Sequence, residues 1–260
     1  MNQLHRLSIS AARVAVAAIV LLGMPAAAQE PAASPKPGAS PKPEASLQPG
    51  EYISERSRGQ LTLKPGKSGA LLFAIEAVGG NGHTCGLEGE LRSGRATLEA
   101  MEEKDPCIVT MRATPSGIEV KGGASGSCQY YCGVRATFED TYFQPAPACR
   151  DKAVTAVRKT FKKLYDSKKF AEARTTLEPL LKDCLRSLDV LDEGRIRNDL
   201  AVTLHKLGDL AGCRDVLKPL AEDAAMSHAQ LQENYPPTDL ESMMPIVRST
   251  RTNLKLCAAK

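Results

Sequence analysis

The sequence FAEARTTLEPLLKD occupies residues 170–183, and a related sequence, LAGCRDVLKPLAED, occupies residues 210–223. At this offset of 40 residues Leu177 corresponds to Leu217, and a small side chain, Ala173 or Cys213, stands four residues before each leucine. An internal period of about 20 to 50 residues is typical of proteins built from stacked units. Because both copies carry apolar residues at helical spacing, the sequence predicts stacked α-helical hairpins in residues 146–260, the helical module.

The second copy, with the residues that precede it, resembles the tetratricopeptide repeat. The resemblance is carried by Leu200, Ala201, Leu204, Leu207, Gly208, Asp209, Leu210, Cys213, Leu217 and Leu220. It implies small residues where paired helices touch, a position that Ala173 and Cys213 fill, and a glycine–acid turn between the helices. The first copy departs from the pattern, because Ser167-Lys168-Lys169 stands at its turn and contains no glycine.

A further helix is predicted over residues 239–257. Its apolar residues stand at i, i+3, i+4 and i+7, namely Leu240, Met243, Met244 and Val247. This spacing gives one apolar face that can cover the last hairpin of the array. Pro245 lies within the pattern, so we expect the helix to kink or to begin there.

Residues 50–145, the β module, alternate apolar and polar residues with a period of two. The alternation is clear at 61–63, 71–75, 96–98, 108–112 and 118–120. Turn-forming pairs such as Pro65-Gly66 and Gly122-Gly123 separate these segments. The pattern predicts a small antiparallel β-barrel or sandwich of roughly eight strands. We expect its closing strand, residues 134–142, to pair near the opening strand at Tyr52.

The first 28 residues are typical of a secretory signal. His5, Arg6 and Arg13 precede an apolar run at 14–24, and Ala26-Ala27-Ala28 forms a cleavage site. The run is shorter than the roughly 20 residues that span a membrane, so we expect a cleaved peptide and a mature chain without a transmembrane segment. An uncleaved anchor is the alternative. No cysteine lies near the site, so the mature chain is not expected to be a lipoprotein.

Residues 29–49 are proline-rich and predict an extended linker.

Eight cysteines lie beyond the predicted signal: Cys85, Cys107, Cys128, Cys132, Cys149, Cys184, Cys213 and Cys257. An even number in an exported chain predicts disulfides. In the helical module the ends of antiparallel helices bring Cys149 to Cys184 and Cys213 to Cys257.

In the β module three pairings are open. We favour Cys85 with Cys107, and Cys128 with Cys132. The alternative is a zinc site in which His83 joins Cys85, Cys128 and Cys132, because the Cys-x3-Cys spacing lies within the zinc range.

The sequence HTCGLEG at 83–89, together with Cys107 and the sequence CQYYCGVRATF at 128–138, resembles a small exported cysteine-rich β domain of uncharacterised proteobacterial proteins. Such domains sometimes stand beside lysozyme-inhibitor-type modules. The resemblance assigns no activity to any residue. Within these stretches we take His83, Tyr130, Tyr131 and Arg135 as possible functional residues.

Charge and motifs exclude several function classes. Without the signal the chain has 32 basic and 30 acidic residues, a net charge of +2, so nucleic acid is not an expected partner. His205 and His228 are expected to be ordinary helix residues, and no catalytic, cofactor-binding or metal-binding residue is predicted. A basic set could meet an anionic partner or could simply be solvated: Arg158, Lys159, Lys162, Lys163, Lys168 and Lys169.

These observations predict a periplasmic or secreted, non-catalytic protein of the cell envelope. Stacked hairpins offer extended surfaces, so we expect the helical module to bind a protein or peptide partner. The alternative is a lysozyme-inhibitor-like or small-ligand-binding protein that acts through the β module. The identity of the partner and the oligomeric state stay open.

Overall fold

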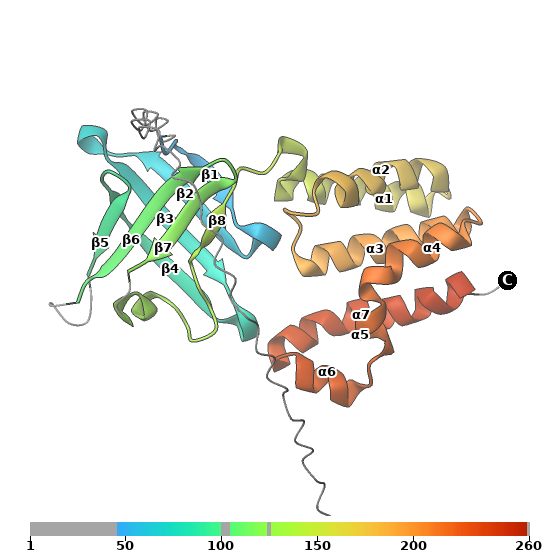
Figure 1. The fold of residues 1–260 in the computed structure, drawn as a ribbon. Coiled ribbons are helices and arrows are strands. Elements are labelled where there is room, and N and C mark those ends of the chain that lie inside the picture. The colour runs from blue at the N-terminus through green and yellow to red at the C-terminus, as the bar shows by residue number, and fades with distance from the viewer. Residues whose placement is uncertain (1–45, 100–104, 124–125, 259–260) are drawn as a thin grey trace, which may run out of the picture. The chain divides into compact units, whose positions relative to one another are not determined.

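The computed structural model describes residues 46–99, 105–123 and 126–258, with strands first and helices after them (Figure 1). Both modules belong to one compact unit, residues 43–260. The predicted signal and residues 29–45 of the predicted linker lie outside the described residues. Among the described helices, none is both long enough and apolar enough to cross a bilayer.

Eight strands of the described residues form two four-stranded antiparallel sheets. The first sheet holds β1 (Gly50–Ile53), β2 (Gly59–Pro65), β3 (Leu71–Val78) and β4 (Thr84–Leu91). The second holds β5 (Arg95–Leu98), β6 (Cys107–Thr114), β7 (Gly117–Gly122) and β8 (Asp140–Tyr142). In each sheet neighbouring strands are consecutive in the chain, as in an antiparallel meander.

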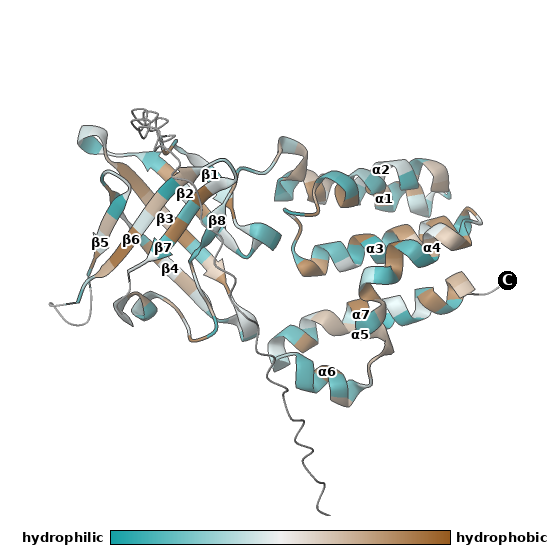
Figure 2. Ribbon diagram, viewed as in Figure 1, coloured by the Kyte–Doolittle hydropathy of each residue, from teal (hydrophilic) through white to brown (hydrophobic). Residues whose placement is uncertain are grey.

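The buried residues of the two sheets form one core, because alternate residues of a strand lie on the same face. Figure 2 shows hydrophobic segments along these strands. Leu61 and Leu63 of β2 and Val109 of β6 are almost completely buried. The sheets are not continuous with each other, so the described strands do not close into a barrel. Ile53 and Phe143 exchange two backbone hydrogen bonds, of 2.9 and 2.8 Å, as an isolated bridge between them.

The predicted closing strand is therefore partly wrong. Pairing near the start of the β module occurs as expected, but β8 covers only Asp140–Tyr142. Residues 134–139 instead pass over Gly79, where an added Cβ would lie 1.9 Å from the backbone oxygen of Arg135.

Six short 3-10 helices also occur in the described residues: η1 (Glu55–Ser57), η2 (Lys67–Gly69), η3 (Gly80–Gly82), η4 (Gly126–Tyr131), η5 (Pro147–Cys149) and η6 (Lys218–Leu220).

The helical module contains seven α-helices in the described residues. They are α1 (Asp151–Asp166), α2 (Phe170–Asp183), α3 (Val190–Lys206), α4 (Leu210–Leu217), α5 (Ala221–Ala225), α6 (His228–Asn234) and α7 (Pro237–Ala258). The helix boundaries repeat with the same offset of 40 residues. Helices α1 and α3 end 40 residues apart, and α2 and α4 begin 40 residues apart. Ala173 and Cys213 are both completely buried at equivalent positions of α2 and α4.

The helix predicted over residues 239–257 is α7, which packs against α3 and α4. Leu240, Met243 and Val247 are buried as the pattern predicts. Pro245 lies inside α7 and does not begin it. At Gly194 of α3 an added Cβ would lie 2.8 Å from the side chain of Ile246, so the glycine allows the close approach of α7.

All eight cysteines form disulfides. The pairs of the helical module, Cys149–Cys184 and Cys213–Cys257, are confirmed. The first joins the start of α1 to the end of α2, and the second joins α4 to the end of α7.

The favoured pairs of the β module are wrong. Cys85 pairs with Cys132, and Cys107 pairs with Cys128. Cys85 lies on β4 and Cys107 on β6, which belong to different sheets. The segment around η4 contacts both strands, and each of its cysteines reaches a different sheet. The disulfides therefore fasten one connecting segment to both sheets. They also occupy the three sulfurs that the alternative zinc site requires.

Candidate binding site on the helical module

The four residues singled out in the β module gather around η4. His83 lies against Gly133, where an added Cβ would be 2.5 Å from the imidazole Nδ1. The Tyr131 hydroxyl donates a 2.6 Å hydrogen bond to the backbone oxygen of Glu99, and its ring meets the Tyr130 ring edge to face. Tyr130 is 64% exposed, and Arg135 is exposed as well. Within the described residues no hydrogen bond joins these four side chains to one another.

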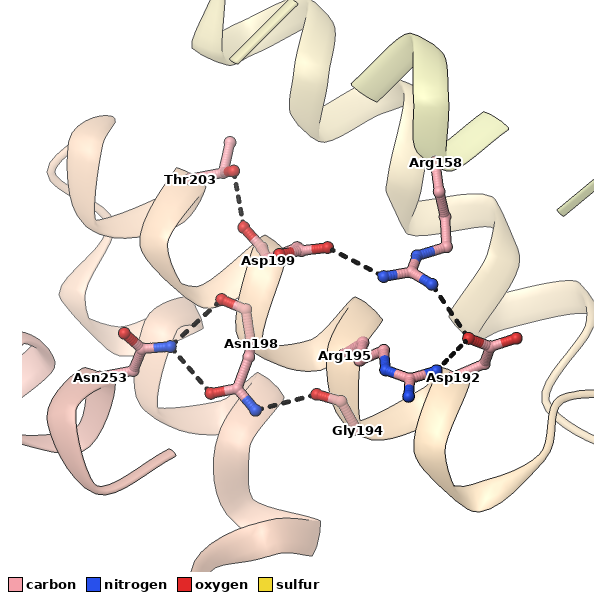
Figure 3. Close-up of polar contacts among 8 residues, drawn as sticks. All are labelled: Arg158, Asp192, Gly194, Arg195, Asn198, Asp199, Thr203 and Asn253. Carbon is pink, nitrogen blue, oxygen red and sulfur yellow. Dashed lines mark hydrogen bonds and ion pairs between the residues drawn. The ribbon is translucent and has the colours of Figure 1, made fainter. Parts of the chain in front are cut away.

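A denser polar arrangement lies on the helical module, where α1, α3 and α7 contribute side chains (Figure 3). Arg158 of α1 donates a 2.9 Å hydrogen bond to the Asp192 carboxylate and lies 3.7 Å from the Asp199 carboxylate. The Asp192 carboxylate also accepts a hydrogen bond of 3.2 Å from the guanidinium group of Arg195. Arg158 thus joins the first hairpin to two acids of the second.

Asp199 is poorly compensated in this arrangement. Burial raises the pKa of its carboxyl above the ordinary aspartate value, and Arg158 offsets that rise only in part. The stronger hydrogen bond of Arg158 goes to Asp192, and its Nε is buried without a hydrogen-bond partner in the described residues. The Asp199 side chain is 39% exposed, so its carboxylate is also open to a further partner from solvent.

A second polar cluster lies between α3 and α7. The Asn198 amide nitrogen donates to the backbone oxygen of Gly194 at 2.9 Å and to the Thr250 hydroxyl at 3.0 Å. The Asn253 amide nitrogen donates to the Asn198 side-chain oxygen at 2.8 Å and to its backbone oxygen at 3.3 Å. Asn198 and Asn253 are each 6% exposed, so these hydrogen bonds satisfy amides that burial would otherwise destabilise.

The two arrangements meet at an open hollow of about 350 Å³. We call it the α3–α7 hollow. It is lined by Asn198, Asp199, Val202, Arg248, Ser249, Thr252 and Asn253. Its walls thus combine an acid, a base and buried amides, a composition that can recognise a polar ligand of mixed charge.

The predicted basic set does not form a uniform cationic face. Arg158 is partly buried against α3, as described above. Lys162 pairs with Asp166 at 2.8 Å and Lys169 with Glu172 at 3.3 Å, so half of the set has acidic partners. Such exposed pairs contribute little to stability, but they reduce the attraction of this surface for an anion.

Sequence reasoning missed the residues that line the α3–α7 hollow. One pattern could have found them. Ile246, Thr250, Asn253 and Cys257 stand at i, i+4, i+7 and i+11 of α7 and form one buried stripe, half of which is polar. Polar residues at buried helix positions require partners, and here the partner is Asn198.

A metal site receives no support from side-chain clustering: the described residues contain no group of three or more histidine, cysteine or acidic side chains placed to hold a metal ion. Comparisons of the chain with protein-family models, with curated proteins and with solved structures give no significant match. The assignment of function therefore depends on the site itself.

Proposed function

We propose that the protein is an exported, non-catalytic interaction protein of the cell envelope, and that its helical module binds a protein or peptide across α1, α3 and α7. Four disulfides support export, because such bonds persist in oxidising compartments. The repeated hairpins support the interaction role, and their spacing and buried small residues fit an array similar to tetratricopeptide repeats.

The observation that carries the proposal is the α3–α7 hollow. Its Asp199 is partly buried and forms one long ion pair among the described residues, at 3.7 Å, and its Asn253 lines the same hollow. Asp199 costs free energy in the unbound protein, because burial removes part of its hydration and Arg158 compensates only in part. A partner that supplies the missing hydrogen bonds would recover this free energy.

The test is capture of a partner by full-length oxidised protein. The wild type and the variant Asp199→Arg are immobilised, exposed to envelope extract and compared by mass spectrometry. Asp215→Arg is the matched control, because Asp215 is an exposed acid on α4. We expect a defined partner to be retained by the wild type and by Asp215→Arg and lost from Asp199→Arg. Equal retention by all three, or retention by none, would contradict the proposal.

One observation favours the alternative function through the β module. Two disulfides fasten the segment around η4 to both sheets, and this segment exposes Tyr130 and Arg135. Exposed tyrosine and arginine side chains are among the residue types that dominate interface hot spots. Full-length protein that slows lysozyme in a turbidity assay, with loss of the effect in Tyr130→Ala, would support inhibition. Absence of inhibition by the wild type would remove this alternative.

A further inference from the structure

We propose that the α3–α7 hollow binds an extended peptide segment that places a basic side chain on Asp199 and a main-chain N–H on Asn253. This inference rests on the proposed function and specifies its ligand. Three features of the hollow carry it: the carboxylate of Asp199, the amide of Asn253 and the length of the hollow along α7.

The acid selects a cation. Asp199 has Arg158 at 3.7 Å as its ion-pair partner in the described residues, and Arg158 is held at shorter distance by Asp192. An incoming ammonium or guanidinium group can therefore form the close, charge-assisted hydrogen bond that Asp199 lacks. Such a bond contributes more at a partly desolvated carboxylate than at a fully hydrated one.

Arg248, the basic residue that lines the hollow, does not reverse the preference for a cationic side chain. Arg248 is exposed and has no ion pair within the described residues. A fully hydrated guanidinium gains little from one more surface ion pair. It can instead donate hydrogen bonds to the carbonyl oxygens of a bound main chain. The acid, and not the base, is therefore the group that decides which side chain is selected.

The buried amide selects a hydrogen-bond donor. Both hydrogen bonds that the Asn253 side chain donates use its nitrogen, and Figure 3 shows the amide oxygen directed away from Asn198. Asn253 lines the hollow and is 6% exposed as a whole, so we take its amide oxygen as an acceptor that a bound ligand can reach. An uncharged acceptor on the wall of an open hollow suits the N–H of a peptide main chain. Asn198 acts as a positioning residue, because its own amide is already bonded on both sides.

The length of the hollow suits an extended segment. The hollow extends along α7 from Arg248 to Asn253, and five residues of helix advance about 7.5 Å. Roughly two residues of extended chain cover that distance. A single small amine would fill only the part of the hollow that surrounds Asp199.

Selection from a phage-displayed library of short random peptides tests the inference, with full-length oxidised protein as the target. We expect enriched peptides to share a lysine or arginine, and one such peptide to bind about tenfold more weakly when that residue is replaced by uncharged norleucine. Asp199→Asn should remove the tenfold preference, whereas Asp215→Asn should keep it. In NMR titration of the isotope-labelled chain, the amides that shift should be those of residues 195–203 and 248–253.

Two results would overturn the inference. Enrichment of peptides without a common basic residue, or a lysine preference that survives Asp199→Asn, would contradict the role of the acid. Failure to enrich any peptide would contradict an extended peptide as the occupant. In both cases the proposed function would still stand if envelope extract yields a partner that Asp199→Arg loses, so the two failures are distinguishable.

Discussion

Arg56 of η1, in the β module, forms an ion pair with Glu193 of α3, in the helical module. Arg197 binds the second carboxylate oxygen of Glu193 at 2.6 Å, and Arg56 also donates to the backbone oxygen of Leu185 at 3.2 Å. The side chain of Glu193 is 12% exposed and that of Arg56 25%. Arg56 itself has a left-handed backbone, with φ of 64°. This strained residue is held in place by bonds from the other module.

Glu193→Gln should therefore destabilise the protein by about 1–3 kcal/mol, because two guanidinium groups lose their charged acceptor. Burial by itself would raise the pKa of Glu193, but hydrogen bonds from Arg197 and Arg56 outweigh it and hold the pKa below its ordinary value. Since the folded pKa is depressed, the contribution is complete above the ordinary glutamate pKa and is lost as pH falls through the folded value.

Urea unfolding of the full chain at pH 7 and at about pH 3 measures this difference. We expect the two proteins to differ clearly at neutral pH and the difference to shrink in acid. Glu233→Gln, at an exposed position of α6, is the control and should behave as the wild type. Equal stability of Glu193→Gln and the wild type at neutral pH would show that the modules do not depend on this contact.

Digestion without reduction, followed by mass spectrometry, should recover the peptide pairs Cys85–Cys132 and Cys107–Cys128. Replacing both members of one pair by alanine should cost about 2–4 kcal/mol, because each bond closes a long loop of the unfolded chain. Recovery of Cys85 joined to Cys107 would contradict the arrangement of η4 between the sheets.

The contrast between the two modules shows which features the sequence can predict. The pairs of the helical module follow from local periodicity, because antiparallel helices of known length bring Cys149 and Cys184 to one end. The pairs of the β module depend on the path of residues 126–136, which have no periodic pattern. Proximity in sequence favoured Cys128 with Cys132, but the short 3-10 turn directs these residues to different sheets.

The residues of the candidate site could not be predicted from the sequence for a related reason. Asp199 and Asn253 are ordinary polar residues of helices, and their meaning depends on the packing of α3 against α7. The contact between Arg56 and Glu193 joins residues 137 positions apart, and no periodicity predicts it. Patterns of side-chain type define elements and faces, whereas pairing between distant elements needs the three-dimensional arrangement.

Lys168→Gly should stabilise the protein by about 0.5–1 kcal/mol. Lys168 has φ of 60° in the turn between α1 and α2, and Gly208 has φ of 79° at the equivalent position between α3 and α4. Glycine adopts this left-handed conformation without the steric cost that a Cβ imposes, although it also increases the entropy of the unfolded chain. Urea unfolding measures the change.

The reciprocal substitution is the control for this turn. Gly208→Lys should destabilise by about 1 kcal/mol, because it introduces into the second turn the strain that the first turn already has. If both substitutions destabilise, the lysine side chain contributes contacts that outweigh the backbone strain, and the two turns are not equivalent.

Asp199→Asn should stabilise the unbound protein at neutral pH and weaken the binding of its partner. Burial raises the folded pKa of Asp199, so the folded state binds more protons than the unfolded state between the ordinary and the raised value. Stability therefore falls as pH rises through that window, and the charged carboxylate destabilises the fold above it. The gain is expected to stay below about 1 kcal/mol, because the side chain is partly exposed and the substitution also removes its pair with Arg158.

The two readouts separate a binding role from a structural one. Thermal unfolding at pH 7 and at about pH 3 should show the gain at neutral pH and its disappearance in acid, where Asp199 is protonated in both states. Partner retention at pH 7 should fall in the same variant. A residue kept for stability would show the reverse, with a lower melting temperature in Asp199→Asn and unchanged retention. The combination of a more stable fold and weaker binding is expected of a group that burial leaves incompletely paired until a ligand arrives.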